Sequence, residues 1–143
     1  MGQKSLPRHP LPFSPYNPGM PLVPGSLNSE YWFREGCYIT EWSNSDADPG
    51  VSIARARVEP GRTTRWHRLD AITERYVILE GCGRAEVDGQ ARDVQTGDVV
   101  VIAPGLAQRI TNTGDTDLVF LAICTPRFRP ENYSEIPELE KSS

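Results

Sequence analysis

The sequence is poor in histidine and cysteine, the residues on which many metal sites and disulfide frameworks depend. It has two histidines in 143 residues, and one of them, His9, lies in a proline-rich stretch. Its three cysteines are odd in number and far apart, with no C-x-x-C pair, so they indicate neither a disulfide framework nor a zinc knuckle. A site built on two or three histidines would therefore have to recruit the N-terminal stretch or a second chain.

The chain also lacks basic clusters and long apolar runs. The net charge is −4 and the arginines are scattered between acids, which is not the pattern of a surface that binds nucleic acid or anionic lipid. No segment is apolar over the length of a membrane span, and prolines rather than an apolar run follow Lys4 and Arg8. We therefore expect a cytoplasmic protein with no nucleic-acid and no membrane partner.

The length and the hydrophobic content of 38% fit a single domain with its own core. Residues 1–30 hold most of the prolines, so we expect an extended arm that either lies across a neighbouring surface or remains a mobile tail. Residues 127–143 are expected to form a tail with at most one short helical turn.

Between these ends, residues 31–126 show the pattern of an all-β domain. Residues 52–58 alternate between two faces, Asp88-Gly89 predicts a tight hairpin, and residues 99–103 are expected to form a buried strand. Roughly eight to ten short strands, broken by Gly, Pro and Asp and without a helical period, predict an antiparallel sandwich or barrel.

Glycines and prolines at fixed spacing form two motifs. The first, G-R-T-T-R-W-H-R-L-D-A-I-T-E-R-Y-V-I-L-E-G, runs from Gly61 to Gly81, and the second, G-D-V-V-V-I-A-P-G-L-A-Q-R-I-T-N, runs from Gly97 to Asn112. They resemble the motifs G-x5-H-x-H-x4-E-x6-G and G-D-x-V-x-I-P-P-G-x2-H-x3-N of the cupin superfamily, and in particular its small single-domain members described as mannose-6-phosphate-isomerase-like. The resemblance implies a jelly-roll barrel, or double-stranded β-helix, over roughly residues 31–126.

The resemblance assigns four positions to a metal site. His67, Leu69, Glu74 and Gln108 stand where metal-binding cupins usually offer three histidines and a carboxylate, so Leu69 and Gln108 replace two histidines. A divalent Fe, Mn, Ni or Zn ion could still be held by His67, Glu74 and Gln108 with water, although the uncharged amide oxygen weakens this ligand set. No organic cofactor is indicated.

The alternation of side chains along a strand predicts which residues share the site. Arg65 and Leu69 should point inward with His67, whereas Trp66 and Arg109 should point outward. The candidate catalytic residues are His67, Glu74 and Tyr76. The candidate substrate-binding residues on the same inward faces are Arg65, Leu69, Gln108, Ile78 and Ile110.

Three functions for this pocket remain open. The first is a small-molecule isomerase, lyase or oxygenase that uses a divalent metal on His67, Glu74 and Gln108. The second is a metal-free binding or sensing module in which Arg65 holds a small acid or a sugar phosphate. The third is a metal-free enzyme in which Arg65 pairs with Glu74 in place of the cation, and His67 and Glu74 act as general acid and base.

The resemblance also implies a homodimer, because small cupins are commonly dimers. The proline-rich arm together with Trp32, Trp42 and Trp66 would suit such an interface. A small-molecule ligand is expected inside the barrel, and the fold by itself does not decide between catalysis and binding.

Overall fold

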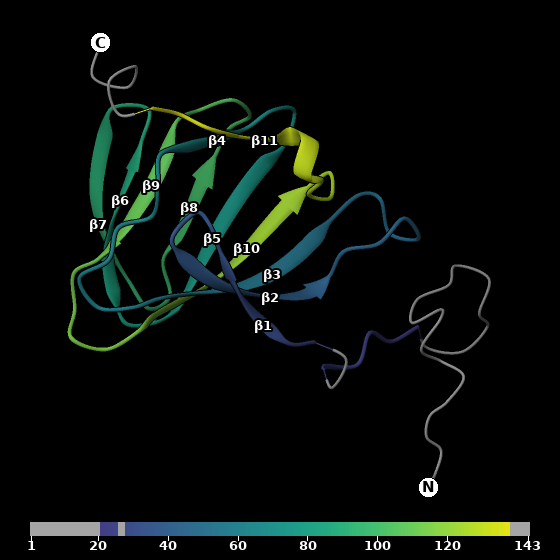
Figure 1. Ribbon diagram of the computed structural model, residues 1–143, viewed down its shortest axis with the longest axis horizontal. Helices are drawn as coiled ribbons and strands as arrows, with labels where there is room; N and C mark the ends of the chain where they lie inside the picture. Colours follow the sequence, from purple (N-terminus) through teal and green to yellow (C-terminus); the bar gives the residue numbers. More distant parts are fainter. Residues whose placement is uncertain (1–20, 26–27, 138–143) are drawn as a thin grey trace, which may run out of the picture.

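A computed structural model describes residues 21–25 and 28–137, which form two antiparallel β-sheets that face each other (Figure 1). The larger sheet has the strand order β1-β2-β3-β10-β5-β8, and the smaller has the order β11-β4-β9-β6-β7. The strands are β1 (Glu30–Phe33), β2 (Cys37–Ser43), β3 (Ser52–Val58), β4 (His67–Leu69), β5 (Thr73–Glu80), β6 (Cys82–Val87), β7 (Gln90–Gln95), β8 (Val99–Ile102), β9 (Gln108–Asn112), β10 (Leu118–Thr125) and β11 (Tyr133–Glu135). The predicted all-β jelly-roll barrel, or double-stranded β-helix, is confirmed, whereas residues 1–20 of the expected arm lie outside the described residues.

Local turn chemistry sets the strand connections. Asp88 and Gly89 join β6 to β7 with φ values of 50° and 82°, the left-handed region that a two-residue hairpin turn of this kind requires. Gly81 has a φ of 83°, and a Cβ atom there would lie 2.7 Å from the carbonyl oxygen of Asp117. The last glycine of the first motif therefore serves the fold rather than the site.

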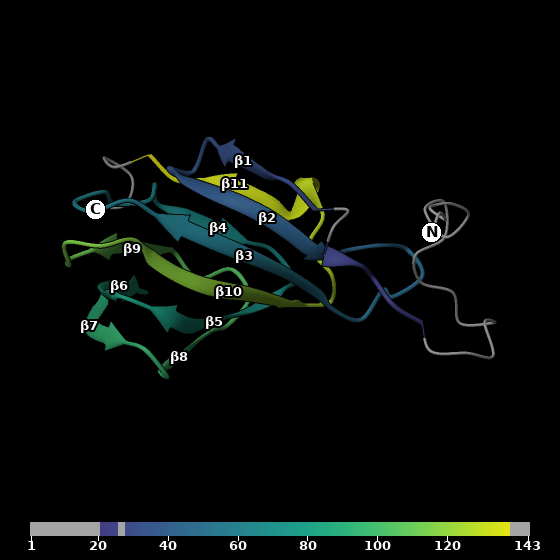
Figure 2. The ribbon, with the colours of Figure 1, turned by 90° about the horizontal axis from the view of Figure 1, so that it is seen from below.

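The main hydrophobic core lies between the two sheets. Strand β5 buries Tyr76 and Ile78 on its inward face, and β10, which pairs with both β3 and β5, adds Phe120. A second, smaller cluster that includes Leu69 and Tyr133 packs separately. Figure 2 shows β1 and β11 on one side of the barrel and β7 and β8 on the other, and the smaller cluster belongs to the β11 side.

Residues 99–103 do not form the buried strand that their apolar sequence predicts. Strand β8 is the last strand of the larger sheet and pairs with β5, and Val99 and Val101 are 54% and 66% exposed while Ile102 is buried. The prediction was wrong because a short apolar run has no local signal for its place in a sheet.

The chain returns to the barrel after residue 126. A 3-10 turn at Pro130–Asn132 leads into β11, which pairs with β4 and sets Tyr133 opposite Leu69. The sequence predicts no strand in residues 127–143, so β11 is an addition to the expected barrel. Among residues 21–25 and 28–137, no helix is long and apolar enough to span a membrane.

Candidate functional site

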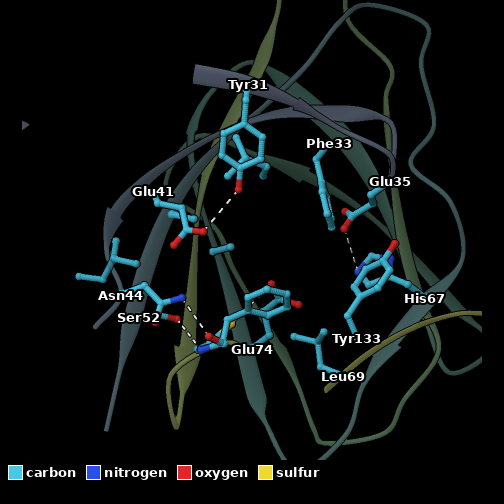
Figure 3. Close-up of a pocket in the computed structure, with 16 residues that line it drawn as sticks. Tyr31, Phe33, Glu35, Glu41, Asn44, Ser52, His67, Leu69, Glu74 and Tyr133 are labelled. Carbon is cyan, nitrogen blue, oxygen red and sulfur yellow. Dashed lines mark hydrogen bonds and ion pairs between the residues drawn. The ribbon is translucent and has the colours of Figure 1, made fainter. Parts of the chain in front are cut away.

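A cavity of about 80 Å³ lies between the two sheets, on the side where β1 and β11 meet (Figure 3). Strands β1, β2, β3, β4, β5, β10 and β11 all contribute side chains to its wall. Its titratable groups include Glu35, His67 and Glu74, and Phe33 and Leu69 are among its apolar groups. The interior of the barrel thus offers a small, partly apolar pocket with convergent ionisable groups, the usual composition of a small-molecule site.

His67, the first residue of β4, is held as a neutral base. Its Nδ1 atom lies 2.8 Å from the carbonyl oxygen of Arg65, which can only accept a hydrogen bond, so Nδ1 carries the proton. The ring stacks on Tyr133 with centroids 5.3 Å apart and is 2% exposed. Burial lowers the pKa of His67, against the opposing effect of Glu74, and the Nε2 lone pair is therefore available as a proton acceptor.

Glu35 faces this lone pair, although no sequence motif includes it. It lies in the turn between β1 and β2, where its carbonyl oxygen accepts a 2.7 Å hydrogen bond from the Arg65 backbone N–H. Its Oε1 atom is 3.6 Å from Nε2 of His67. Burial first, and then the charge of Glu135, raise the pKa of Glu35 to about 8, so at neutral pH this carboxyl group is mostly a proton donor.

Glu74 is the second buried acid of the cavity. Its position on β5 sets it opposite Cys124 of β10, whose thiol lies 3.9 Å from Oε2, while no side chain or backbone group of the described residues meets hydrogen-bond geometry at the buried Oε1. Burial raises the pKa of Glu74 to about 7, an effect that His67 opposes and Glu35 reinforces. Glu74 therefore titrates near neutral pH and has an oxygen free for a ligand.

Gln108 and Tyr76 are buried beside the ionisable groups of the site, and hydrogen bonding to Gln108 opposes the effect of burial on the pKa values of His67 and Glu74, raising the first and lowering the second. Gln108 is the direct strand partner of His67, and its amide oxygen accepts a hydrogen bond from the Tyr76 hydroxyl. Tyr76 packs on Phe120 with ring centroids 4.5 Å apart, and burial keeps the pKa of its hydroxyl well above the ordinary value. Both side chains are buried and neither lines the cavity, so Tyr76 does not reach a ligand in the predicted catalytic role.

The predicted inward position of Arg65 is wrong. Its side chain is 66% exposed and lies 3.7 Å from Glu135, not from Glu74. Strand β4 begins at His67, so Arg65 precedes the strand and the alternation that orients His67 and Leu69 does not extend to it. The hypothesis that Arg65 holds a small acid or sugar phosphate in the pocket fails with this geometry.

The remaining predicted positions divide between the cavity and the core. Leu69 lines the cavity, whereas Ile78 and Ile110 belong to the main core and do not line it. Trp66 is not the exposed interface residue that alternation suggested, because it is 5% exposed and the Arg109 guanidinium lies 4.4 Å from its ring centroid.

The donor set does not fit a divalent cation. Leu69 has no donor atom, and the amide oxygen of Gln108, the atom through which glutamine would ligate, is engaged by Tyr76. In the described part of the chain, no three His, Cys, Asp or Glu side chains are arranged to hold a metal ion. The predicted metal ligands His67, Glu74 and Gln108 are therefore not supported as a set, and His67 and Glu74 are left as acid–base groups.

Known proteins match the region that carries both motifs. The cupin domain family matches residues 54–124. An uncharacterised protein of Methanocaldococcus jannaschii is 32% identical over 104 residues, which cover 71% of this chain and 83% of that protein. The chain belongs to the cupin superfamily. This cupin is also 37% identical over 71 residues to an oxalate-binding protein of Thermotoga maritima, across 50% of this chain and 59% of that protein.

A solved structure supports the cupin fold. The nucleoside dehydratase Pac13 of Streptomyces superposes with a TM-score of 0.68, covering 80% of this chain and 88% of that chain. The sequence identity is 14%, so this likeness concerns the fold alone. Together with the family match, it supports the cupin fold of this chain and does not indicate a ligand.

The two sequence motifs contain only some of the residues that form the cupin pocket. The motifs identified His67 and Glu74, which both line the cavity. Glu35 and Tyr133 lie outside both motifs, in the β1–β2 turn and in β11, and had no local signal of their own. Tertiary contacts bring them against the imidazole, because β11 pairs with β4 and the carbonyl oxygen of Glu35 accepts a hydrogen bond from the Arg65 backbone.

Proposed function

We propose that this cupin is a metal-free enzyme that catalyses proton transfer on a small molecule, as a lyase or isomerase. The observation that carries the proposal is the 3.6 Å approach of His67 Nε2 to Glu35, beside a second buried carboxyl group on Glu74. Since burial lowers the pKa of the imidazole and raises those of Glu35 and Glu74 to about 8 and about 7, a proton acceptor faces two proton donors near neutral pH.

This arrangement suits the elimination of water next to a carbonyl group. His67 Nε2 would take the proton from the carbon beside the carbonyl, and the electron pair of that C–H bond would form the new C=C bond. Protonated Glu74 would give its proton to the departing hydroxyl group, which leaves as water with the C–O electrons. The proton on His67 would return to Glu74 by way of Glu35 or solvent and restore the starting state.

An isomerisation would use the same first step. His67 would return the proton to a neighbouring carbon instead, and no group would leave. The cupin fold accommodates elimination chemistry in at least one other case, since the Streptomyces protein of this fold is a nucleoside dehydratase.

Three further proposals rest on sequence. The spacing of the two motifs favours the small single-domain, mannose-6-phosphate-isomerase-like kind of cupin. The exposed Trp32 and Trp42 would suit a homodimer interface. The absence of basic and apolar runs favours a cytoplasmic location.

The test is a search for exchange and turnover in D₂O. Protein treated with a chelator is incubated with small hydroxyaldehydes, hydroxyketones, hydroxyacids and nucleosides, and proton NMR follows the loss of C–H signals and the growth of vinyl signals. His67→Asn and Glu74→Gln should each lower the rate by about 100-fold or more. Arg65→Ala, an exposed control, should not. Undiminished activity in His67→Asn, or activity that needs an added divalent metal, would contradict the proposal.

A further inference from the structure

The cavity wall has several acidic side chains and, within the described residues, no lysine or arginine to balance them. Three glutamates line it, Glu35, Glu41 and Glu74, and among the described residues no arginine or lysine does. Sites for carboxylate or phosphate ligands normally provide a guanidinium, an ammonium or a helix N-terminus. An anion in this cavity would lie among carboxyl groups without a countercharge, which is strongly unfavourable at a buried position.

Two arginines come close to the site and stay outside its wall. Arg34 lies over the ring of Tyr133, 5.1 Å from the centroid, and is 67% exposed beside Glu135. Arg65 is likewise exposed beside Glu135. Neither guanidinium lines the cavity, and both already have a carboxylate partner.

Two buried oxygen atoms of the cavity wall have unused hydrogen-bonding capacity. Among the described residues, no partner meets hydrogen-bond geometry at Glu74 Oε1 or at the Tyr133 hydroxyl oxygen, although Gln108 and Arg34 lie close enough to lower the pKa values of these two groups. Figure 3 labels both residues in the wall of the cavity. Buried polar atoms of this kind are normally paired, so a ligand is expected to complete them. A hydroxyl or carbonyl group can accept the Tyr133 proton, which an ammonium group cannot do.

We infer that the cavity binds a small uncharged compound with hydroxyl or carbonyl groups, which hydrogen-bonds to Glu74 and Tyr133, and does not bind a carboxylate or a phosphate. The inference rests on the proposed function in that this compound would be the substrate on which His67 acts. The apolar side chains of Phe33 and Leu69 would cover its C–H surface. The cavity volume of about 80 Å³ keeps the buried part of the ligand small.

The test compares small ligands of similar size that are uncharged, anionic or cationic. Saturation-transfer NMR at pH 7 measures binding of dihydroxyacetone and glycerol, of D-glycerate, and of 2-amino-1,3-propanediol, with oxalate added in the presence and absence of Mn²⁺. The uncharged compounds should bind about tenfold more tightly than glycerate and oxalate. Ala122→Leu, which narrows the cavity without removing an ionisable group, should abolish this binding, and the exposed Val101→Leu should not.

Each outcome bears on a separate claim. Preferred binding of glycerate, of oxalate with or without Mn²⁺, or of the ammonium compound would overturn the inference, as would the absence of binding by both uncharged compounds. Selective binding of uncharged compounds without turnover of any substrate would contradict the proposed enzyme and leave the ligand class standing. Turnover of a carboxylate or phosphate that depends on His67 would support the proposed enzyme and overturn the inferred ligand class.

Discussion

The Nε2 atom of His67 lies 3.6 Å from a carboxyl oxygen of Glu35, a residue of the β1–β2 turn that no motif marks. The other ring nitrogen of His67 is 2.8 Å from the carbonyl oxygen of Arg65. The same Arg65 donates its backbone N–H to the carbonyl oxygen of Glu35. One short segment before β4 therefore fixes both the tautomer of the base and the position of the acid beside it.

The first prediction concerns the protonation of His67. Because Nδ1 faces a carbonyl oxygen and burial lowers the pKa, the ring should stay neutral with its proton on Nδ1 at pH 7 and well below it. Nitrogen-15 chemical shifts of the imidazole would report this directly, and His9→Asn removes the other histidine signal. A proton on Nε2, or a charged ring at pH 7, would contradict the assignment.

The second prediction is a pH dependence of stability. Glu35 has a raised pKa, about 8 against an ordinary 4.5, so between these values the folded state keeps a proton that the unfolded state has lost. The free energy of unfolding should therefore fall as the pH rises through this window. Glu35→Gln cannot ionise, so its free energy of unfolding in urea denaturation should rise relative to that of the wild type by about 4 kcal/mol between pH 5 and pH 9.

The variant must be compared with the wild type because other ionisable groups also change the free energy of unfolding in this pH range. Glu135, Cys37, Glu74 and Tyr133 interact electrostatically with Glu35, and the lowered pKa of His67 has the opposite effect, adding stability as the pH rises toward 6.5. The exposed Glu80→Gln serves as the matched control and should track the wild type at every pH. A constant difference between Glu35→Gln and the wild type would show that Glu35 does not titrate in this window.

The third prediction concerns metal binding. The wild type should not bind Mn²⁺, Fe²⁺, Ni²⁺ or Zn²⁺ stoichiometrically at micromolar concentration, because Leu69 has no donor atom and the Gln108 amide oxygen is engaged by Tyr76. The double variant Leu69→His/Gln108→His restores histidine at the two positions where metal-binding cupins usually have it, and it should bind one ion. Elemental analysis after dialysis checks both, with the exposed Leu79→His as control. Stoichiometric metal in the wild type that is lost in His67→Asn would refute the metal-free reading.

The fourth prediction concerns the hydrogen bond between Tyr76 and Gln108. Tyr76→Phe removes the hydrogen bond to the Gln108 amide oxygen at a buried position, and we expect a loss of about 1–2 kcal/mol in the free energy of unfolding. Tyr31→Phe removes a hydroxyl at an exposed position, where it lies 3.4 Å from Glu41, and should change stability by less than about 0.5 kcal/mol. If the two substitutions lowered the free energy of unfolding equally, the Tyr76–Gln108 hydrogen bond would contribute nothing to stability.

The site could be predicted only where it follows from the motifs. Alternation within a strand correctly paired His67 with Leu69 and Glu74 with Tyr76, because side-chain direction has a period of two along a strand. It failed at Arg65, which lies before the first residue of β4. The end of a strand is set by pairing partners elsewhere in the chain, and no local pattern marks it.

By itself the sequence determined the barrel, since turns such as Asp88-Gly89 depend on backbone conformations that each residue type adopts or avoids locally. It also determined that the usual set of histidines is incomplete. Only the tertiary structure decided that Glu35 and Tyr133, distant in the chain, lie against His67, and that no arginine among residues 21–25 and 28–137 lines the cavity. It also decided the protonation of these groups, because burial, which depends on the whole fold, raises the pKa of an acid and lowers that of a base.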